Sequence, residues 1–192
     1  MADFRGPSNA RRAVADYLRG PALQRTLERL RADWQLDEAD LPAADVVSQV
    51  EPAALDRFPL IAVTSGGQRR LRRVDLLPDA DVFSATYPVR VYVWVRESGR
   101  ERVVDVRDDL ATAVMVSLVE DVTLGRSDMR VEDGAMSVEP SDVTPVHGDR
   151  FVAGAYVGFD LTVEEQLTRP ALGVAAAVDV EVSVYADPQS AR

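Results

Sequence analysis

The 192-residue sequence predicts an α/β protein of the α+β kind, in which helices pack on a mixed, mainly antiparallel β-sheet. Two observations predict this class. Apolar residues recur at helical spacing in two regions, and apolar and polar residues alternate in three others. Apolar residues make up 46% of the chain, which is enough to bury one sizeable core. The length suits a single domain, because one core is usually built from roughly 100 to 200 residues.

Residues 8 to 34 are predicted to form two short helices separated by Gly20-Pro21, where Gly ends one helix and Pro opens the next. An apolar stripe on the second helix indicates that this helix packs on something. The stripe consists of Leu23, Leu27, Leu30 and Trp34. Residues 35 to 57 are acidic and rich in Pro and Ala, which predicts an extended surface connection with one short turn.

The first strands are expected after this connection. Residues 58 to 64 are apolar and β-branched, and Gly66-Gly67 separates them from residues 69 to 74, so a β-hairpin is predicted. From Tyr87 to Arg96 the alternation predicts a strand with one face of valines and one face of Arg and aromatic residues. The valine face comprises Val89, Val91, Val93 and Val95, and the other comprises Arg90, Tyr92, Trp94 and Arg96.

Residues 105 to about 119 are predicted to form a helix that lies across the sheet, with Asp105 as its N-cap. Its buried positions are Leu110, Val114 and Leu118, which are four residues apart, and Ala111, Met115, Val116 and Val119 widen the apolar arc. Residues 123 to 150 contain Gly, Asp and Pro between short β-prone pieces, around residues 129 to 132 and 135 to 139. This mixture predicts weak hairpins or a flexible loop.

A long strand is predicted from Phe151 to Val163, because apolar residues occupy every odd position there. After Arg169-Pro170 a second alternating run, 174 to 184, has valines and Ala176 on one face and Asp179, Glu181 and Ser183 on the other. The sequence therefore predicts a domain over residues 1 to 170 and a C-terminal β-strand extension over residues 171 to 192.

The composition excludes several classes of function. The chain has no Cys, so thiolate catalysis and cysteine metal sites are excluded, and all 22 basic residues are Arg, so Schiff-base chemistry on Lys is excluded as well. No stretch reaches the run of about 18 apolar residues that a membrane helix needs, and the N-terminus lacks the layout of a secretion signal, so no membrane partner is expected. A formal net charge of −10 disfavours sequence-specific binding to nucleic acid.

Candidate chemical groups are few. His147 is the single imidazole, in a loop context typical of a solvated side chain. The acidic clusters at residues 37 to 40, at Asp79 and Asp81, and at Glu164-Glu165 lack the ligand spacing of a calcium loop and are interpreted as solvated surface. Ser65-Gly66-Gly67 lacks the Lys of a phosphate loop and is interpreted as a hairpin turn. We therefore assign no catalytic, cofactor-binding or metal-binding residue, and we expect no enzymatic activity and no cofactor.

One charged cluster stands out in so acidic a chain. It consists of Arg69, Arg70, Arg72 and Arg73. On a strand, Arg70 and Arg72 share one face, and Arg69 and Arg73 share the other. Two interpretations remain open: the charges protect an edge strand against aggregation, or they pair with an acidic surface of a neighbouring protein.

The order of elements resembles the tail terminator proteins of long-tailed bacteriophages, also called tail completion or minor tail proteins of the neck. The resemblance covers residues 9 to 170 and rests on residue types and their order. Its four stretches are the helical segment ending near Trp34, residues 58 to 63, residues 87 to 95 with the helix from Asp105 to Val119, and residues 154 to 163 before Glu164-Glu165. The run from 171 to 192 departs from that pattern.

The resemblance implies a structural virion protein with an α/β sandwich fold. Such proteins form a hexameric ring on the tail tube, end its polymerisation and present a surface to the head-completion proteins, while genomic DNA passes through the lumen without specific binding. It implies a homo-hexamer whose partners are the tail tube protein and a head-completion or stopper protein. It also implies assembly in the bacterial host cytoplasm and a place in the virion neck. The alternatives are another head-tail connector or stopper subunit and, from a different class, a small metal-dependent hydrolase.

Overall fold

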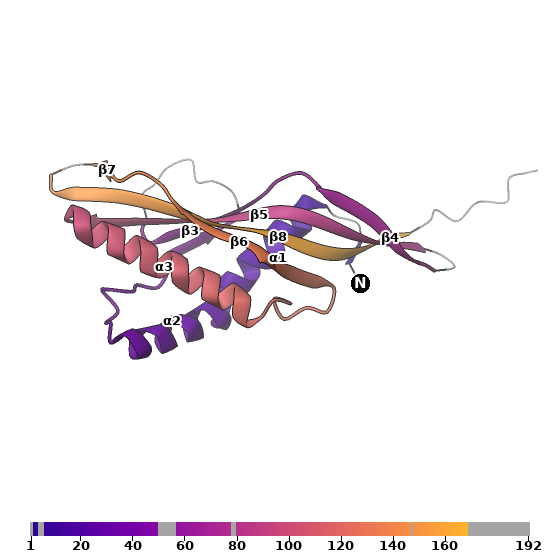
Figure 1. Cartoon of the computed structure of the whole chain (residues 1–192), viewed down its shortest axis with the longest axis horizontal. Helices are drawn as coiled ribbons and strands as arrows, with labels where there is room; N and C mark the ends of the chain where they lie inside the picture. Colours follow the sequence, from indigo (N-terminus) through magenta and orange to yellow (C-terminus); the bar gives the residue numbers. More distant parts are fainter. Residues whose placement is uncertain (1, 4–5, 50–56, 78–79, 147, 169–192) are drawn as a thin grey trace, which may run out of the picture.

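The computed structural model describes residues 2–3, 6–49, 57–77, 80–146 and 148–168. Within these ranges an eight-stranded sheet carries three helices on one of its faces (Figure 1). The helices are α1 (Pro7–Arg19), α2 (Pro21–Trp34) and α3 (Arg100–Glu120). The strands are β1 (Ala2–Asp3), β2 (Val46–Ser48), β3 (Leu60–Ser65), β4 (Arg70–Leu76), β5 (Ala80–Ser98), β6 (Met129–Pro140), β7 (Thr144–Pro145) and β8 (Arg150–Thr168). The predicted α+β class with a mainly antiparallel mixed sheet is confirmed.

Two long antiparallel strands, β5 and β8, form the centre of the sheet. They pair along their whole length, from Ala80 opposite Thr168 to Ser98 opposite Arg150. At about 3.3 Å per residue each spans about 60 Å. Strands β3 and β4 lie on the outer side of β5, and β6, β7 and β1 lie on the outer side of β8. The parallel pairs are β1 with β8 and β2 with β3.

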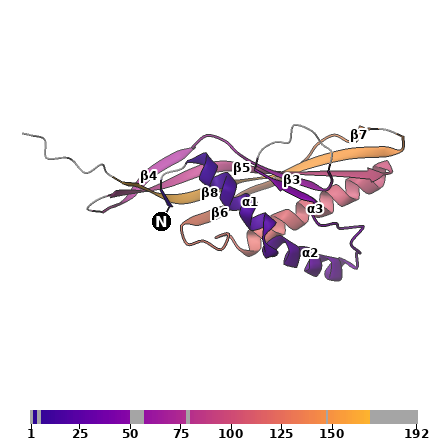
Figure 2. The same ribbon diagram turned by 180° about the vertical axis from the view of Figure 1, so that it is seen from behind.

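The core lies between the sheet and the helices (Figure 2). The predicted valine face of β5 is buried there, and so are the odd positions of β8 from Ala153 to Val163. Helices α1 and α2 meet at Gly20, and Pro21 opens α2, as predicted. Of the predicted α2 stripe, Leu23, Leu27 and Leu30 are buried, but Trp34, the last helical residue, is 39% exposed.

Helix α3 begins earlier than the sequence pattern indicates. Its N-cap is Gly99, with φ of 91°, and Asp105 lies well inside the helix, so the prediction of Asp105 as N-cap is wrong. The extra turn is stabilised by burial of Val103 and by Glu101 in the first turn, where a negative charge interacts favourably with the helix dipole. Leu110, Val114 and Leu118 are fully buried, as expected, whereas Val119 is exposed.

The predicted hairpin between β3 and β4 is wrong. Both strands pair antiparallel with β5 and follow one another along its edge. Pro88 of β5 stands opposite the break between them, and it has no N–H to donate to a ladder. After β3 the chain therefore leaves the ladder with β5. It stays close to β5 through one hydrogen bond, from the Gly66 N–H to the Pro88 carbonyl at 2.9 Å. The hairpin partner of β4 is β5.

Two connections also contain more structure than their sequences indicate. The connection after α2 includes β2 and the fully buried Leu41, although extended surface chain was expected. In place of the expected weak hairpins or flexible loop, residues 129 to 140 form one strand, β6, with an irregularity between Glu132 and Ser137. Pairing with the long β8 template compensates for the weak local signal. The C-terminal extension, residues 171 to 192, lies outside the described residues, as do Asp79 and His147.

Candidate functional site

Two surfaces of the sheet carry the chemistry that the described residues offer. The first is the open face, defined as the side of β5 and β8 opposite the helices, around Arg90, Tyr92, Trp94, Tyr156 and Asp160. These positions alternate with the buried valine face of β5 and the buried odd positions of β8. The side chains of Tyr92, Trp94, Tyr156 and Asp160 are half-buried, and that of Arg90 is exposed.

Aromatic and guanidinium groups contact one another across the strands of the open face. The rings of Tyr92 and Tyr156, which are direct neighbours in register, lie 5.6 Å apart between centroids. The Arg90 guanidinium lies 5.2 Å from the centre of the Tyr156 ring. The Tyr156 hydroxyl donates to Glu139 of β6, and this hydrogen bond raises the pKa of Tyr156. These contacts fix three strands against one another without a core on this side.

Gly154 of β8 makes room for an aromatic side chain of β5. A Cβ atom at this position would lie 2.7 Å from two ring carbons of Trp94, its direct cross-strand neighbour. The six-membered ring of the indole therefore occupies the space that a side chain at position 154 would take. Next along β5, the Arg96 guanidinium lies 4.8 Å from the centre of the Phe58 ring. The alternation of the sequence predicts this face, but not the packing of Trp94 on glycine.

A groove of about 460 Å³ crosses the open face between the β3–β4 break and β6. It is lined by Ser65, Gly66 and Arg69 on one side and by Ser137 and Glu139 on the other. The Arg69 guanidinium is already paired with Asp160, at 2.8 and 3.0 Å from its two carboxylate oxygens. Ser65-Gly66 forms a break between two strands, and not the predicted hairpin turn. The groove is also lined by Arg90, Glu139 and Asp160, so it carries charges of both signs and is not a purely cationic cradle for an anion.

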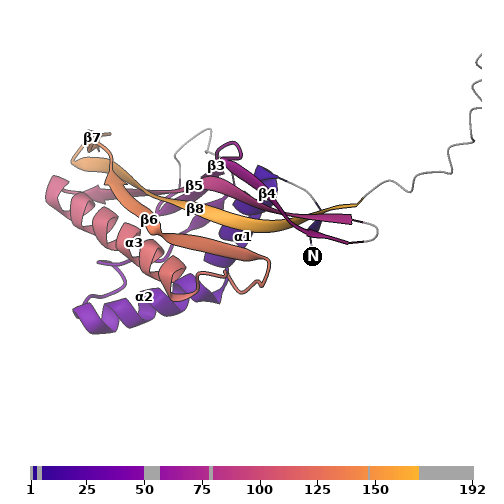
Figure 3. The ribbon, with the colours of Figure 1, turned by 45° about the vertical axis from the view of Figure 1, so that its right-hand side comes forward.

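The second surface is the arm, defined as β4 together with the segments of β5 and β8 that run beside it, residues 80 to 86 and 162 to 168. The arm extends beyond the helices (Figure 3). All seven residues of β4 are exposed, and within the described part of the chain β4 pairs with β5 alone. The arm therefore ends laterally in a strand edge of seven residues whose outer side is open.

The structure places the four arginines of the cluster differently from the prediction. Arg70 and Arg72 stand opposite Thr86 and Ser84, on the open face of the sheet, as expected for residues that share a face. Arg69 precedes the strand and pairs with Asp160 on this same face, so the prediction that it shares a face with Arg73 is wrong. Arg73 lies on the other face, 3.7 Å from Asp81 and 5.8 Å from the ring centre of Phe83.

Exposed apolar side chains lie between the charged residues of the arm, a feature that was not predicted from the sequence. Leu71, Val74, Leu76 and Leu167 are 46%, 47%, 59% and 49% exposed. Exposed apolar groups gathered on one projecting element are typical of an interaction surface. The sequence does contain a signal for this surface, in the run from Arg70 to Leu76. A fully solvated strand has mainly polar and charged residues, whereas this run also contains two leucines and a valine.

Glu165 was interpreted as solvated acidic surface, and this prediction is wrong. Its side chain is fully buried, and its two oxygens accept hydrogen bonds from the Gly6 backbone N–H at 2.9 Å and from the Tyr87 hydroxyl at 2.8 Å. Burial, followed by this hydrogen bond, raises the pKa of Tyr87. Glu165 thus fixes the start of α1 to the centre of the sheet. Its neighbour Glu164 is exposed, as predicted.

The cluster near residue 37 has a local structural role. Asp37 accepts hydrogen bonds from the backbone N–H groups of Asp40 and Ala39, and these lower the pKa of Asp37, the bond from Asp40 most. The side chain of Asp40 pairs with Arg102 at 3.2 Å. Among the described residues no group of three or more His, Cys, Asp or Glu side chains is placed to hold a metal ion.

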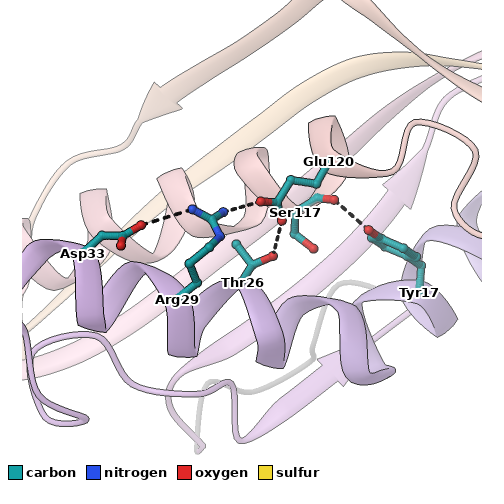
Figure 4. Close-up of polar contacts among 6 residues, drawn as sticks. All are labelled: Tyr17, Thr26, Arg29, Asp33, Ser117 and Glu120. Carbon is teal, nitrogen blue, oxygen red and sulfur yellow. Dashed lines mark hydrogen bonds and ion pairs between the residues drawn. The ribbon is translucent and has the colours of Figure 1, made fainter.

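Polar contacts also fix the helices to one another (Figure 4). The Tyr17 hydroxyl of α1 donates to the Ser117 carbonyl of α3 at 2.7 Å, and burial raises the pKa of Tyr17. The Thr26 hydroxyl of α2 donates to Glu120 of α3 at 2.7 Å, and Arg29 pairs with this same carboxylate. The helical layer therefore acts as a rigid support behind the sheet.

Comparison of the chain with models of known protein families gave no match, and comparison with curated proteins gave none either. Among the described residues, no helix has both the length and the apolar character needed to cross a membrane.

Proposed function

We propose that this protein is a structural subunit of a bacteriophage neck, in which six copies form a ring that caps the tail tube and ends its polymerisation. The observation that carries the proposal is the one-sided fold. Three helices brace one face of the sheet, and within the described part of the chain no further element covers the open face, the arm or its strand edge. These are the surfaces that neighbouring subunits would contact. Ring contacts are heterologous, so they require two different surfaces on each copy. The resemblance of the sequence to tail terminator proteins supports the same assignment.

The charge of the chain suits a ring through which DNA passes. Six copies at −10 carry −60 formally, and a lumen that repels phosphate lets DNA slide without sticking. The protein is therefore expected to leave duplex DNA unbound at physiological salt. Retention of labelled duplex DNA in a gel-shift assay at that salt would contradict the proposed acidic lumen.

Stoichiometry on tail tubes tests the ring directly. Purified protein is added to isolated tail tubes, and the complexes are examined by native mass spectrometry and by electron microscopy. The proposal predicts six copies at one end of each tube and no further growth when tube subunits are added. A dimer, an irregular number of copies, or tubes that continue to grow would contradict it.

A head-completion or stopper subunit is the second structural candidate, and a small metal-dependent hydrolase is the candidate from a different class. Electron microscopy distinguishes a stopper from the proposed tube-capping subunit, because a stopper binds beneath the portal and leaves free tube ends uncapped. A thermal-shift screen with divalent cations tests the hydrolase, which requires a large rise in Tm with one metal.

A further inference from the structure

We infer that the outer edge of β4 binds the C-terminal segment 174 to 184 of a neighbouring copy, which adds to the sheet as one more strand. The inference deepens the proposed ring and rests on it, since it names the contact that joins one subunit to the next. It begins from the edge itself. Within the described part of the chain, the outer edge of β4 is open and its seven residues are exposed, three of them large and apolar. Such an edge can bind an extended segment, which pairs with its free backbone groups as an added strand.

The two faces of β4 differ in chemistry. Arg70 and Arg72 lie on the open face, and in the described part of the chain neither has an ion-pair partner. Leu71 lies on the opposite face, the one that the helices cover further along the sheet, and is nearly half exposed. Arg73 shares this face with Leu71, but its guanidinium is already paired with Asp81, at 3.7 Å. A strand that pairs with this edge must therefore offer acidic groups on one face and apolar groups on the other.

The segment 174 to 184 has this alternation. Its apolar positions include Val178, Val180 and Val182, and Asp179 and Glu181 fall between them. Strand residues alternate faces with a period of two, so one register satisfies both faces. If Val180 stands opposite Leu71, then Asp179 and Glu181 stand opposite the two arginines, whether the added strand runs parallel or antiparallel. The guanidinium groups then pair with carboxylates, and Leu71 loses its contact with water.

The path of the chain favours a neighbouring copy over the same copy. The described part of β8 reaches Thr168, opposite Ala80, whereas β4 lies on the other side of β5. To reach its own β4, the segment would cross the ends of two strands at the turn where Leu77 and Ala80 are hydrogen-bonded. Strands that follow one another in sequence usually lie side by side, so such a crossing is disfavoured. The donor end and the acceptor edge are also different surfaces, as a heterologous ring requires.

Charge reversal in the full-length chain tests the pairing. One variant carries Arg70→Glu and Arg72→Glu, and a second carries Asp179→Arg and Glu181→Arg. Each alone sets like charges against one another across the edge, so each should self-associate on the order of tenfold more weakly or worse by analytical ultracentrifugation. When the two variants are mixed, opposite charges meet at every contact. The acidic segment of the first variant pairs with the arginine edge of the second, and the arginine segment of the second pairs with the acidic edge of the first. The mixture should recover the oligomer that neither forms alone.

Controls keep each outcome interpretable. Circular dichroism melting shows whether each variant folds, and only folded variants are compared. Arg12→Glu with Arg25→Glu makes the same change of charge as the first variant, on exposed positions of α1 and α2, and should leave self-association unchanged.

Four results would overturn the inference: unchanged self-association of either variant, an equal loss in the helix control, no recovery on mixing, or a wild-type chain that stays monomeric at every concentration. Recovery in a single chain carrying all four changes, without recovery on mixing, would assign the segment to its own copy. The proposed function is judged separately, because a wild-type hexamer on tail tubes that survives these variants would retain the ring and reject only this contact.

Discussion

At the scale of single residues, the buried carboxylate of Glu165 is expected to contribute strongly to stability. Glu165→Ala removes the acceptor of two buried donors, the Gly6 N–H and the Tyr87 hydroxyl. A buried donor left without a partner costs about 1 to 3 kcal/mol, so the loss of two such partners should lower the free energy of unfolding by about 2 to 6 kcal/mol. Urea denaturation measures the change.

The adjacent residue supplies a matched control for this prediction. Glu164 has the same side chain, but it is exposed. Glu164→Ala should change the free energy of unfolding by no more than about 0.5 kcal/mol. Equal effects at the two positions would show that Glu165 has no special role.

Asp109 of α3 should give a pH-dependent effect. Burial first, and then the charges of Asp105, Asp108 and Asp40, raise its pKa. An acid whose pKa is raised by folding destabilises the folded state once the pH exceeds its unfolded value. Asp109→Asn should therefore increase stability at pH 7, by less than about 1 kcal/mol, and the gain should vanish below the ordinary pKa of Asp. Urea titrations at pH 7 and pH 3 measure this, and a gain that persists at pH 3 would show that the ionisation of Asp109 is not its cause.

At the scale of elements, the contact of α2 with α3 allows a partly buried hydrogen bond and an exposed ion pair to the same carboxylate to be compared. Thr26 is 2% exposed and donates to Glu120, whereas Arg29 and Glu120 are each 45% exposed at the side chain. Thr26→Ala should lower the free energy of unfolding by about 1 to 2 kcal/mol, since it removes a hydrogen bond and buried atoms. Arg29→Ala should cost only about 0.2 to 1 kcal/mol. Thermal denaturation of both variants tests the order, and a larger effect of Arg29→Ala would contradict it.

The elements themselves differed in how well their sequences predicted them. The long strands and the two N-terminal helices were predicted because each carries an uninterrupted period of apolar residues or a Gly-Pro boundary. Strand β6 was not predicted as one element, because its middle contains Asp133 and Gly134, which disfavour a strand locally. Its pairing with β8 depends on a partner that begins ten residues later in the chain.

At the scale of the whole molecule, self-association should weaken as salt is added. The inferred contact pairs exposed Arg70 and Arg72 with acidic residues, and the screening length falls from about 10 Å at 0.1 M salt to about 3 Å at 1 M. Analytical ultracentrifugation across this range should show a several-fold rise in the dissociation constant. Arg70→Gln with Arg72→Gln should flatten the dependence, while Arg12→Gln with Arg25→Gln should leave it unchanged. A salt-independent wild-type constant would contradict an electrostatic contact.

The sequence by itself determined the class of fold, the faces of β5 and β8, and the presence of an unusual arginine cluster. The fold class and the two faces follow from local periodicity, because in a strand or helix the apolar residues recur at the positions that face the core. The tertiary structure alone decided that β3 and β4 share one edge of β5, that Arg69 turns to Asp160, and that Glu165 is buried while Glu164 is not. Each of these depends on a partner far away in the chain, such as Pro88, Asp160 or Gly6. A contact across such a separation leaves no periodic signal in either of the segments that it joins.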